Sequence, residues 1–122
     1  MHLQIGEVAA RTELSIKTIR HYDEVGLVTP SARSAGGFRL YTTEDVDRLF
    51  AIRRMKPLGF SLDEMGELLT ALDTLRDPTA DHAQATAFLA ECHTRAGEAY
   101  VKLTKQVAYA RELTEQLAQY GT

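Results

Sequence analysis

Residues 15–41, SIKTIRHYDEVGLVTPSARSAGGFRLY, carry the pattern that decides the fold. Ser15 is a typical helix N-cap, and Gly26 ends a helix because it enters the left-handed region at little cost. The Gly36-Gly37 pair is typical of a hairpin tip, and strand-favouring residues follow it: Phe38, Leu40 and Tyr41. The stretch therefore predicts a short helix from about 16 to 25 and a small β-hairpin within 28–41.

One further short helix is predicted on the N-terminal side of this stretch. Ile5, Val8 and Ala9 recur at helical spacing, and the pattern ends around Thr12. Two short helices with a tight connection, followed by a hairpin, form a winged helix-turn-helix pattern in which the second helix enters the DNA major groove. The alternative is a small helical domain whose basic face is merely solvated.

Two more helices are predicted after the hairpin. Thr42 or Thr43 caps the first of them, and Pro57 with Gly59 ends it. Ser61 to Glu64 read as a capping box for the next helix, which fades near Asp73. We expect a mainly α protein in which residues 1–72 form the winged domain and residues 73–82 a polar connector.

Residues 83–122 predict one long helix, because proline is absent there and apolar residues step by three and four. A helix of this length cannot bury its apolar stripe alone, so we expect it to pair with the same helix of a second copy. The expected dimerisation seam has one polar member, Gln106, and consists of Ala96, Ala99, Leu103, Gln106, Ala110, Leu113, Leu117 and Tyr120.

The formal net charge of −3 hides an uneven distribution of charge along the chain. Residues 1–60 carry nine Lys and Arg against seven Asp and Glu, whereas residues 61–122 carry five against ten. A basic first half attached to an acidic second half suggests an anionic partner for the first half only.

Several classes of protein are disfavoured by composition and motifs. The single cysteine, Cys92, excludes an internal disulfide framework and fits a reducing, cytoplasmic compartment. No apolar run approaches the length of a membrane span, no signal peptide is visible, and no phosphate loop, HExxH pair or nucleophile motif points to an enzyme. We expect no cofactor and no metal site, because Cys92 and His93 point about 100° apart on a helix; the alternative is a site that Cys92, His93 and His82 build across a dimer.

Five short blocks, in this order, resemble the MerR family of bacterial transcription regulators. They are Ile5–Ala9, Thr18–Tyr22, Gly26–Val28, Gly37–Tyr41 and Leu58–Leu62, and the match spans residues 3 to about 72. The resemblance implies a winged-helix DNA-binding domain, a long antiparallel dimerisation helix and a homodimer on a pseudo-palindromic operator. It also implies that the protein distorts promoter DNA so that RNA polymerase engages both promoter elements.

The resemblance and the basic residues together give a set of expected DNA contacts. The recognition helix contributes Ser15, Lys17, Thr18, Arg20, His21 and Tyr22, where His21 replaces a frequent tyrosine. The wing contributes Arg33, Gly37, Phe38, Arg39 and Tyr41, and the following helix contributes Arg54 and Lys56.

Three alternatives to these assignments stay open at the level of sequence. Phe38 and Tyr41 either pack the wing or touch DNA. Arg20 either contacts DNA or pairs with a nearby carboxylate such as Asp23 or Glu24. The rival function is a coiled-coil scaffold or interaction protein that binds no specific DNA sequence.

Overall fold

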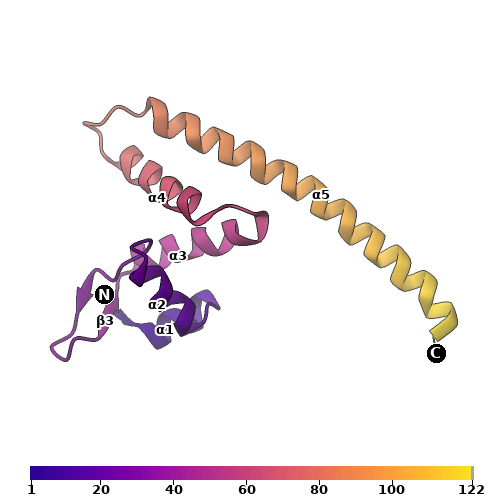
Figure 1. The fold of residues 1–122 in the computed structure, drawn as a ribbon, viewed down its shortest axis with the longest axis horizontal. Helices are drawn as coiled ribbons and strands as arrows, with labels where there is room; N and C mark the ends of the chain where they lie inside the picture. Colours follow the sequence, from indigo (N-terminus) through magenta and orange to yellow (C-terminus); the bar gives the residue numbers. More distant parts are fainter. Residues whose placement is uncertain (122) are drawn as a thin grey trace. The chain divides into compact units, whose positions relative to one another are not determined.

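The computed structural model describes residues 1–121 and divides into two compact units, the first ending at Asp73 and the second beginning at Thr74. The first unit contains β1 (Leu3–Gln4), α1 (Ile5–Thr12), α2 (Ile16–Glu24), β2 (Ala32–Arg33), β3 (Arg39–Tyr41) and α3 (Thr43–Met55), as Figure 1 shows. A 3-10 turn (Lys56–Leu58) leads to α4 (Leu62–Arg76), and α5 (Ala83–Gly121) follows. The mainly helical class with a small wing sheet is as predicted.

The predicted helix starts are confirmed by their hydrogen bonds. Ser15 Oγ accepts from the backbone N–H of Thr18 at 3.0 Å, which caps α2. Thr42, not Thr43, caps α3 and forms a reciprocal capping box with Asp45. Each cap satisfies backbone donors that have no partner inside the first helical turn.

The predicted helix ends also hold. Gly26 follows α2 with a φ of 75°, and Gly59 ends the 3-10 turn with a φ of 86°, both in the region that side chains disfavour. Pro57 sits in that turn, where its missing N–H costs no helical hydrogen bond. Helix α4 continues to Arg76 instead of fading near Asp73, so residues 73–76 of the expected connector are helical. Between Glu67 and Asp77 the sequence has neither proline nor glycine, so no such residue ends the helix near Asp73.

The wing belongs to a three-stranded antiparallel sheet in the order β1-β3-β2. Ala32 pairs with Leu40 and Arg33 with Arg39, which confirms the predicted hairpin. Strand β1 was not predicted, and it pairs Leu3 with Tyr41 on the other edge of β3. Two residues are too few to show an alternating pattern, so only the pairing across the fold reveals this strand.

The core of the first unit is built from one face of each helix. Helix α1 packs against α2 and α3, and β1 packs against β3. The side chains that are fully or almost fully buried there are Leu3, Val8, Thr12, Ile19, Tyr22, Val28, Tyr41, Val46, Leu49, Ile52, Met65 and Leu69. The buried hydroxyl of Thr12 donates to the backbone oxygen of Val8 at 2.8 Å and so is satisfied.

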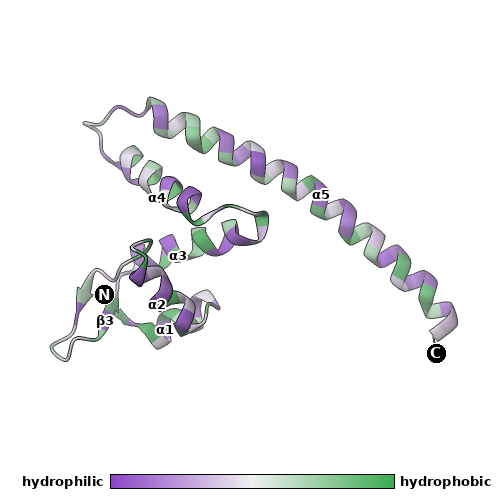
Figure 2. Cartoon of the chain, viewed as in Figure 1, coloured by the Kyte–Doolittle hydropathy of each residue, from purple (hydrophilic) through white to green (hydrophobic). Residues whose placement is uncertain are grey.

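Helix α5 is one unbroken helix, as predicted, with Thr122 outside the described residues. Every described residue from Tyr100 onward is exposed. Figure 2 shows hydrophobic and hydrophilic residues alternating along its length, and more than half of the surface of Leu113 and Leu117 is exposed. Within residues 1–121, no helix is both long enough and apolar enough to cross a membrane.

Tyr41 carries the one buried side-chain polar atom among the described residues that has no hydrogen-bond partner, its hydroxyl oxygen. An unpaired buried hydroxyl costs about 1–3 kcal/mol of desolvation. We therefore expect Tyr41→Phe to raise the free energy of unfolding by about 1 kcal/mol, measured by urea and thermal unfolding. Tyr109→Phe, at an exposed position of α5, is the matched control and should change nothing. A clear loss of stability in Tyr41→Phe would show that the hydroxyl has a partner.

Candidate nucleic-acid interface

Helix α2 has one buried face and one exposed cationic face. Ile19 and Tyr22 are buried, whereas Lys17, Arg20 and His21 are exposed. Because residues three and four apart share a helix face, these three side chains lie together on the side opposite the core. Among the described residues, Lys17 and Arg20 have no carboxylate within ion-pair distance, so their charge is available to an anionic partner.

Ser15 and Thr18 stand at the start of the same helix and are engaged with each other. The Ser15 hydroxyl donates to Thr18 Oγ1 at 2.8 Å while it accepts from the Thr18 backbone N–H. Both lie on the surface or partly so. Their first task is therefore to begin α2 at the right residue, which fixes the direction in which Lys17 and Arg20 point.

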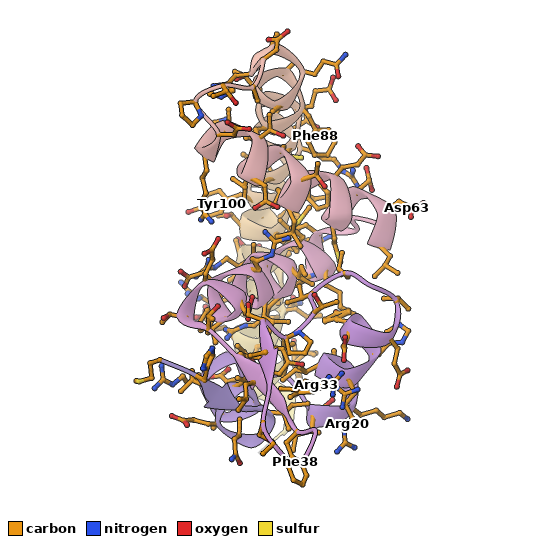
Figure 3. The ribbon with its side chains drawn as sticks, turned by 90° about the vertical axis from the view of Figure 1, so that its left-hand side faces the viewer. Arg20, Arg33, Phe38, Asp63, Phe88 and Tyr100 are labelled. Carbon is orange, nitrogen blue, oxygen red and sulfur yellow. The ribbon has the colours of Figure 1, made fainter. Side chains whose placement is uncertain are left out.

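The tip of the wing is a hydrogen-bonded turn that lies next to the cationic face of α2. Arg33 Nη1 donates to the backbone oxygen of Gly37 at 3.1 Å, which closes the turn, and Phe38 is 70% exposed. A depression of about 150 Å³ is lined by residues of the N-terminus, α2 and the wing: Gln4, Ile5, Gly6, Arg20, Arg33, Gly37, Phe38 and Arg39. Figure 3 shows Arg20, Arg33 and Phe38 at one end of the first unit, away from Asp63.

Asp23, in the last turn of α2, connects the helix to the wing. Its Oδ2 accepts from Arg39 Nε at 2.6 Å and lies 3.4 Å from Arg33 Nη2. The hydrogen bond to Asp23 raises the pKa of Arg39 above its ordinary value. The ion pair that the structure gives to Asp23 is thus with the two wing arginines, not with Arg20. Sequence reasoning considered only neighbours along the helix, and Arg39 is sixteen residues away.

Helix α3 contributes Arg53 and Arg54, and the 3-10 turn after it contributes Lys56; the three basic residues differ in their surroundings. Arg53 donates to the backbone oxygen of Thr12 at 2.8 Å and ties α1 to α3, a role that the sequence did not indicate. The Arg54 guanidinium lies 5.4 Å from the centre of the Phe50 ring. Arg54 and Lys56 are exposed, and neither has an ion pair among the described residues.

Two expected contact residues lie in the core instead of on the surface. Tyr22 is 4% exposed and Tyr41 is fully buried, and burial raises the pKa of both phenols. The period of α2 turns Tyr22 toward the same side as Ile19, and Tyr41 of β3 is the cross-strand partner of Leu3 in the buried part of the sheet. For Tyr41, the structure selects the packing alternative; Phe38, by contrast, is free to meet a partner.

The expected seam of α5 lies on an exposed helix. Ala96 and Ala99 are half-buried, and the seam members from Leu103 to Tyr120 are exposed, Gln106 and Ala110 included. Arg95, Lys102, Tyr109 and Gln116 flank the seam on one side by their heptad spacing. The surface of α5 in this single chain is therefore available to another helix.

Cys92 is half-buried on α5. Within the described part of the chain, no three His, Cys, Asp or Glu side chains come together as a metal ion would require. His82, one of the residues weighed for such a site, places its Nε2 2.7 Å from the backbone oxygen of Asp77.

The arrangement of basic side chains in the first unit is suited to binding a polyanion. Exposed cations stand on α2, the wing holds two arginines beside them, and an aromatic side chain projects from the wing tip. Phosphate backbones are bound by such cationic surfaces, and helices with exposed side chains read base edges in the major groove.

Comparison with known proteins supports this interpretation of the site. The profile described as MerR HTH family regulatory protein matches residues 3–72, and the profile described as MerR, DNA binding matches residues 46–120. HiNmlR, a MerR family regulator lacking the sensor domain and solved bound to promoter DNA, has the same fold, with a TM-score of 0.73. The two chains are 22% identical, and the match covers 98% of this chain and 90% of that one.

Two curated relatives are bacterial transcription regulators. An uncharacterised HTH-type regulator of Pseudomonas aeruginosa is 44% identical over 79 residues, which cover 65% of this chain and 60% of that protein. The regulator CueR of Vibrio cholerae is 34% identical over 118 residues, which cover 97% of this chain and 78% of that protein. The chain thus spans about 60% of the length of the first relative and more of the second. Two family profiles match, and a relative 34% identical aligns over 97% of this chain, so the chain belongs to the MerR family of helix-turn-helix regulators.

Proposed function

We propose that the chain is a DNA-binding transcription regulator. The observation that carries the proposal is the unpaired cationic face of α2, on which Lys17 and Arg20 stand next to a wing with two arginines. Helix α2 enters the major groove, and the wing reaches the adjacent backbone or minor groove. The relatives are regulators and not enzymes. As part of the proposal, the protein acts on promoter DNA in the bacterial cytoplasm.

The proposed contacts fall into groups by what each residue offers. Lys17, Arg20 and His21 reach base edges or phosphate from α2, and Ser15 and Thr18 add hydroxyls at its start. Arg33, Gly37, Phe38 and Arg39 form the wing contact, while Arg54 and Lys56 touch phosphate. Tyr22 and Tyr41 are buried, and their packing in the core holds α2 and β3 in position.

We also propose that the functional unit is a homodimer. Residues 1–72 are the DNA-binding domain, and residues 83–122 pair with the same helix of a second copy in an antiparallel coiled coil. The exposed seam, in which Leu103, Leu113 and Leu117 are each about half exposed, supports this pairing. Two domains related by a twofold axis then bind two inverted half-sites, and distortion of the DNA between them brings the promoter to RNA polymerase.

A coiled-coil scaffold that binds no specific DNA is the weaker alternative. It accounts for α5 but leaves the shaped wing and the cationic face of α2 without a role. The family of the chain also weighs against it.

Selection of DNA from a random pool by the purified protein tests the function directly. We expect the selected sequences to contain two inverted half-sites, because two domains on a twofold axis present the same surface twice. Removing one half-site should weaken binding far more than a single base change does. Equal affinity for an isolated half-site would contradict the dimeric arrangement, and no selected sequence at all would contradict the function.

The variant Lys17→Ala tests the face of α2. We expect a loss of about 1–3 kcal/mol in binding free energy, measured by titration of the selected DNA at several salt concentrations. A contact to a base should relax specificity at one position, and a contact to phosphate should lower the salt slope by about one unit. Lys105→Ala, on the exposed surface of α5, is the control. Unchanged affinity for Lys17→Ala would place the contact surface elsewhere.

The double variant Leu103→Asp, Leu117→Asp tests the seam. Burying unpaired carboxylates in a helix interface is strongly unfavourable, so we expect a monomer in sedimentation analysis. The control is Val101→Asp with Ala108→Asp, which adds the same charges on the opposite side of α5 by heptad spacing and should stay dimeric. If the seam variant still sediments as a dimer, the seam has been misassigned.

A further inference from the structure

Two arginines face each other on the wing. Arg33 of β2 and Arg39 of β3 are direct cross-strand partners, and the ladder that holds them has only two residue pairs. Like charges directly opposite one another weaken a strand pair. A ladder this short is marginal without help, so the wing needs something that offsets the repulsion.

Asp23 is the group that offsets it. One carboxylate oxygen, Oδ2, accepts from Arg39 Nε at 2.6 Å and lies 3.4 Å from Arg33 Nη2. The Asp23 side chain is 13% exposed and that of Arg39 22%, so both are held against the protein. The bridge joins α2, β2 and β3, three elements that meet at the proposed DNA surface.

The geometry leaves the outer part of the Arg39 guanidinium available. Arg39 uses Nε for Asp23, and its two Nη groups donate to no atom within residues 1–121. A guanidinium has five N–H donors in a rigid plane, so holding it at Nε also fixes where the others point. Arg39 lines the same depression as Arg20 and Phe38.

We infer that Asp23 is a positioning residue for DNA binding: it holds Arg33 and Arg39 against the last turn of α2 and so sets the wing relative to the recognition helix. The inference rests on the proposed function and deepens it. Asp23 itself touches no DNA in this scheme. It acts by reducing the side-chain freedom that two arginines would otherwise lose on binding.

Electrostatics alone gives the opposite expectation. Asp23 is an anion beside a surface that binds a polyanion, so removing its charge should strengthen DNA binding if the residue has no positioning role. A positioning role gives weaker binding instead. The sign of the change therefore decides between the two, whatever its size.

The test uses the full chain with Asp23→Asn and, as a matched control, Glu24→Gln. Glu24 is the next residue of α2, is exposed and has no ion pair among the described residues, so its substitution removes the same charge without breaking the bridge. We expect Asp23→Asn to bind the selected DNA about tenfold or more weakly and with a salt slope lower by one to two units. Glu24→Gln should bind as the native chain does or more tightly, with the native slope.

Base preference separates this role from general damage to the domain. Since α2 and its Lys17 remain in place, Asp23→Asn should select the same half-sites as the native chain. Partly exposed ion pairs contribute about 0–1 kcal/mol to stability, so its thermal unfolding should change little. Native-like binding or tighter binding by Asp23→Asn would overturn the inference and leave the proposed function intact.

A second variant keeps the inference testable if Asp23→Asn unfolds. Arg39→Lys retains the positive charge, but a lysine has a single ammonium group. It cannot hydrogen-bond to Asp23 through one nitrogen and present a planar pair of donors to DNA at the same time, so we expect a similar loss of DNA affinity and a similar decrease of the salt slope. Full affinity for Arg39→Lys would overturn the inference. Without DNA, the NMR signal of the Arg39 Nε–H should be protected from exchange in the native chain and lose that protection in Asp23→Asn. Failure of the native chain to bind any DNA would instead overturn the proposed function.

Discussion

A wing of this size cannot hold its own shape, and the rest of the first unit is arranged to hold it. Its strands have two and three residues. At the base, the buried carboxylate of Asp45 accepts from Ser31 before β2 and from Thr42 after β3, with Ser31 Oγ at 2.6 Å and Thr42 N at 2.9 Å. Nearer the tip, Asp23 binds Arg33 and Arg39. Two carboxylates, one from each flanking helix, thus close the hairpin where backbone hydrogen bonds alone are too few.

Most of the helical framework could be predicted because its signals are local. A cap such as Ser15, or a stop such as Gly26, acts on backbone groups within four residues, so the sequence around it contains the whole interaction. The hairpin followed from its glycines for the same reason. What could not be predicted is what the fold brings together from a distance: the pairing of Leu3 with Tyr41 and the bridge from Asp23 to Arg39. For Tyr41 the sequence left packing and DNA contact as equal alternatives, and only the fold shows that the side chain is buried.

The candidate site shows the same division. The exposed cations Lys17 and Arg20 were predictable, since residue type and helical period place them on one face. Tyr22 shares their helix, and its burial was not predicted, because a tyrosine in an amphipathic helix fits the core as well as the surface. In α5 the helical period could be predicted from the sequence, whereas the partner that we propose for its exposed leucines lies outside this chain.

The Lys and Arg residues that we propose as DNA contacts divide into two kinds. Among the described residues, Lys17, Arg20, Arg54 and Lys56 have no carboxylate partner, so they supply the attraction for a distant polyanion, and salt weakens that attraction. Arg33 and Arg39 share one carboxylate, so with Asp23 they add a single net positive charge to the long-range field. Their contribution is geometric: each arginine side chain carries about 2 kcal/mol of rotamer entropy, and the part restrained before binding is not lost on binding. A chain with a net negative charge can therefore carry a DNA-binding surface. A few unpaired cations attract the polyanion, and the paired arginines hold a fixed geometry for contact.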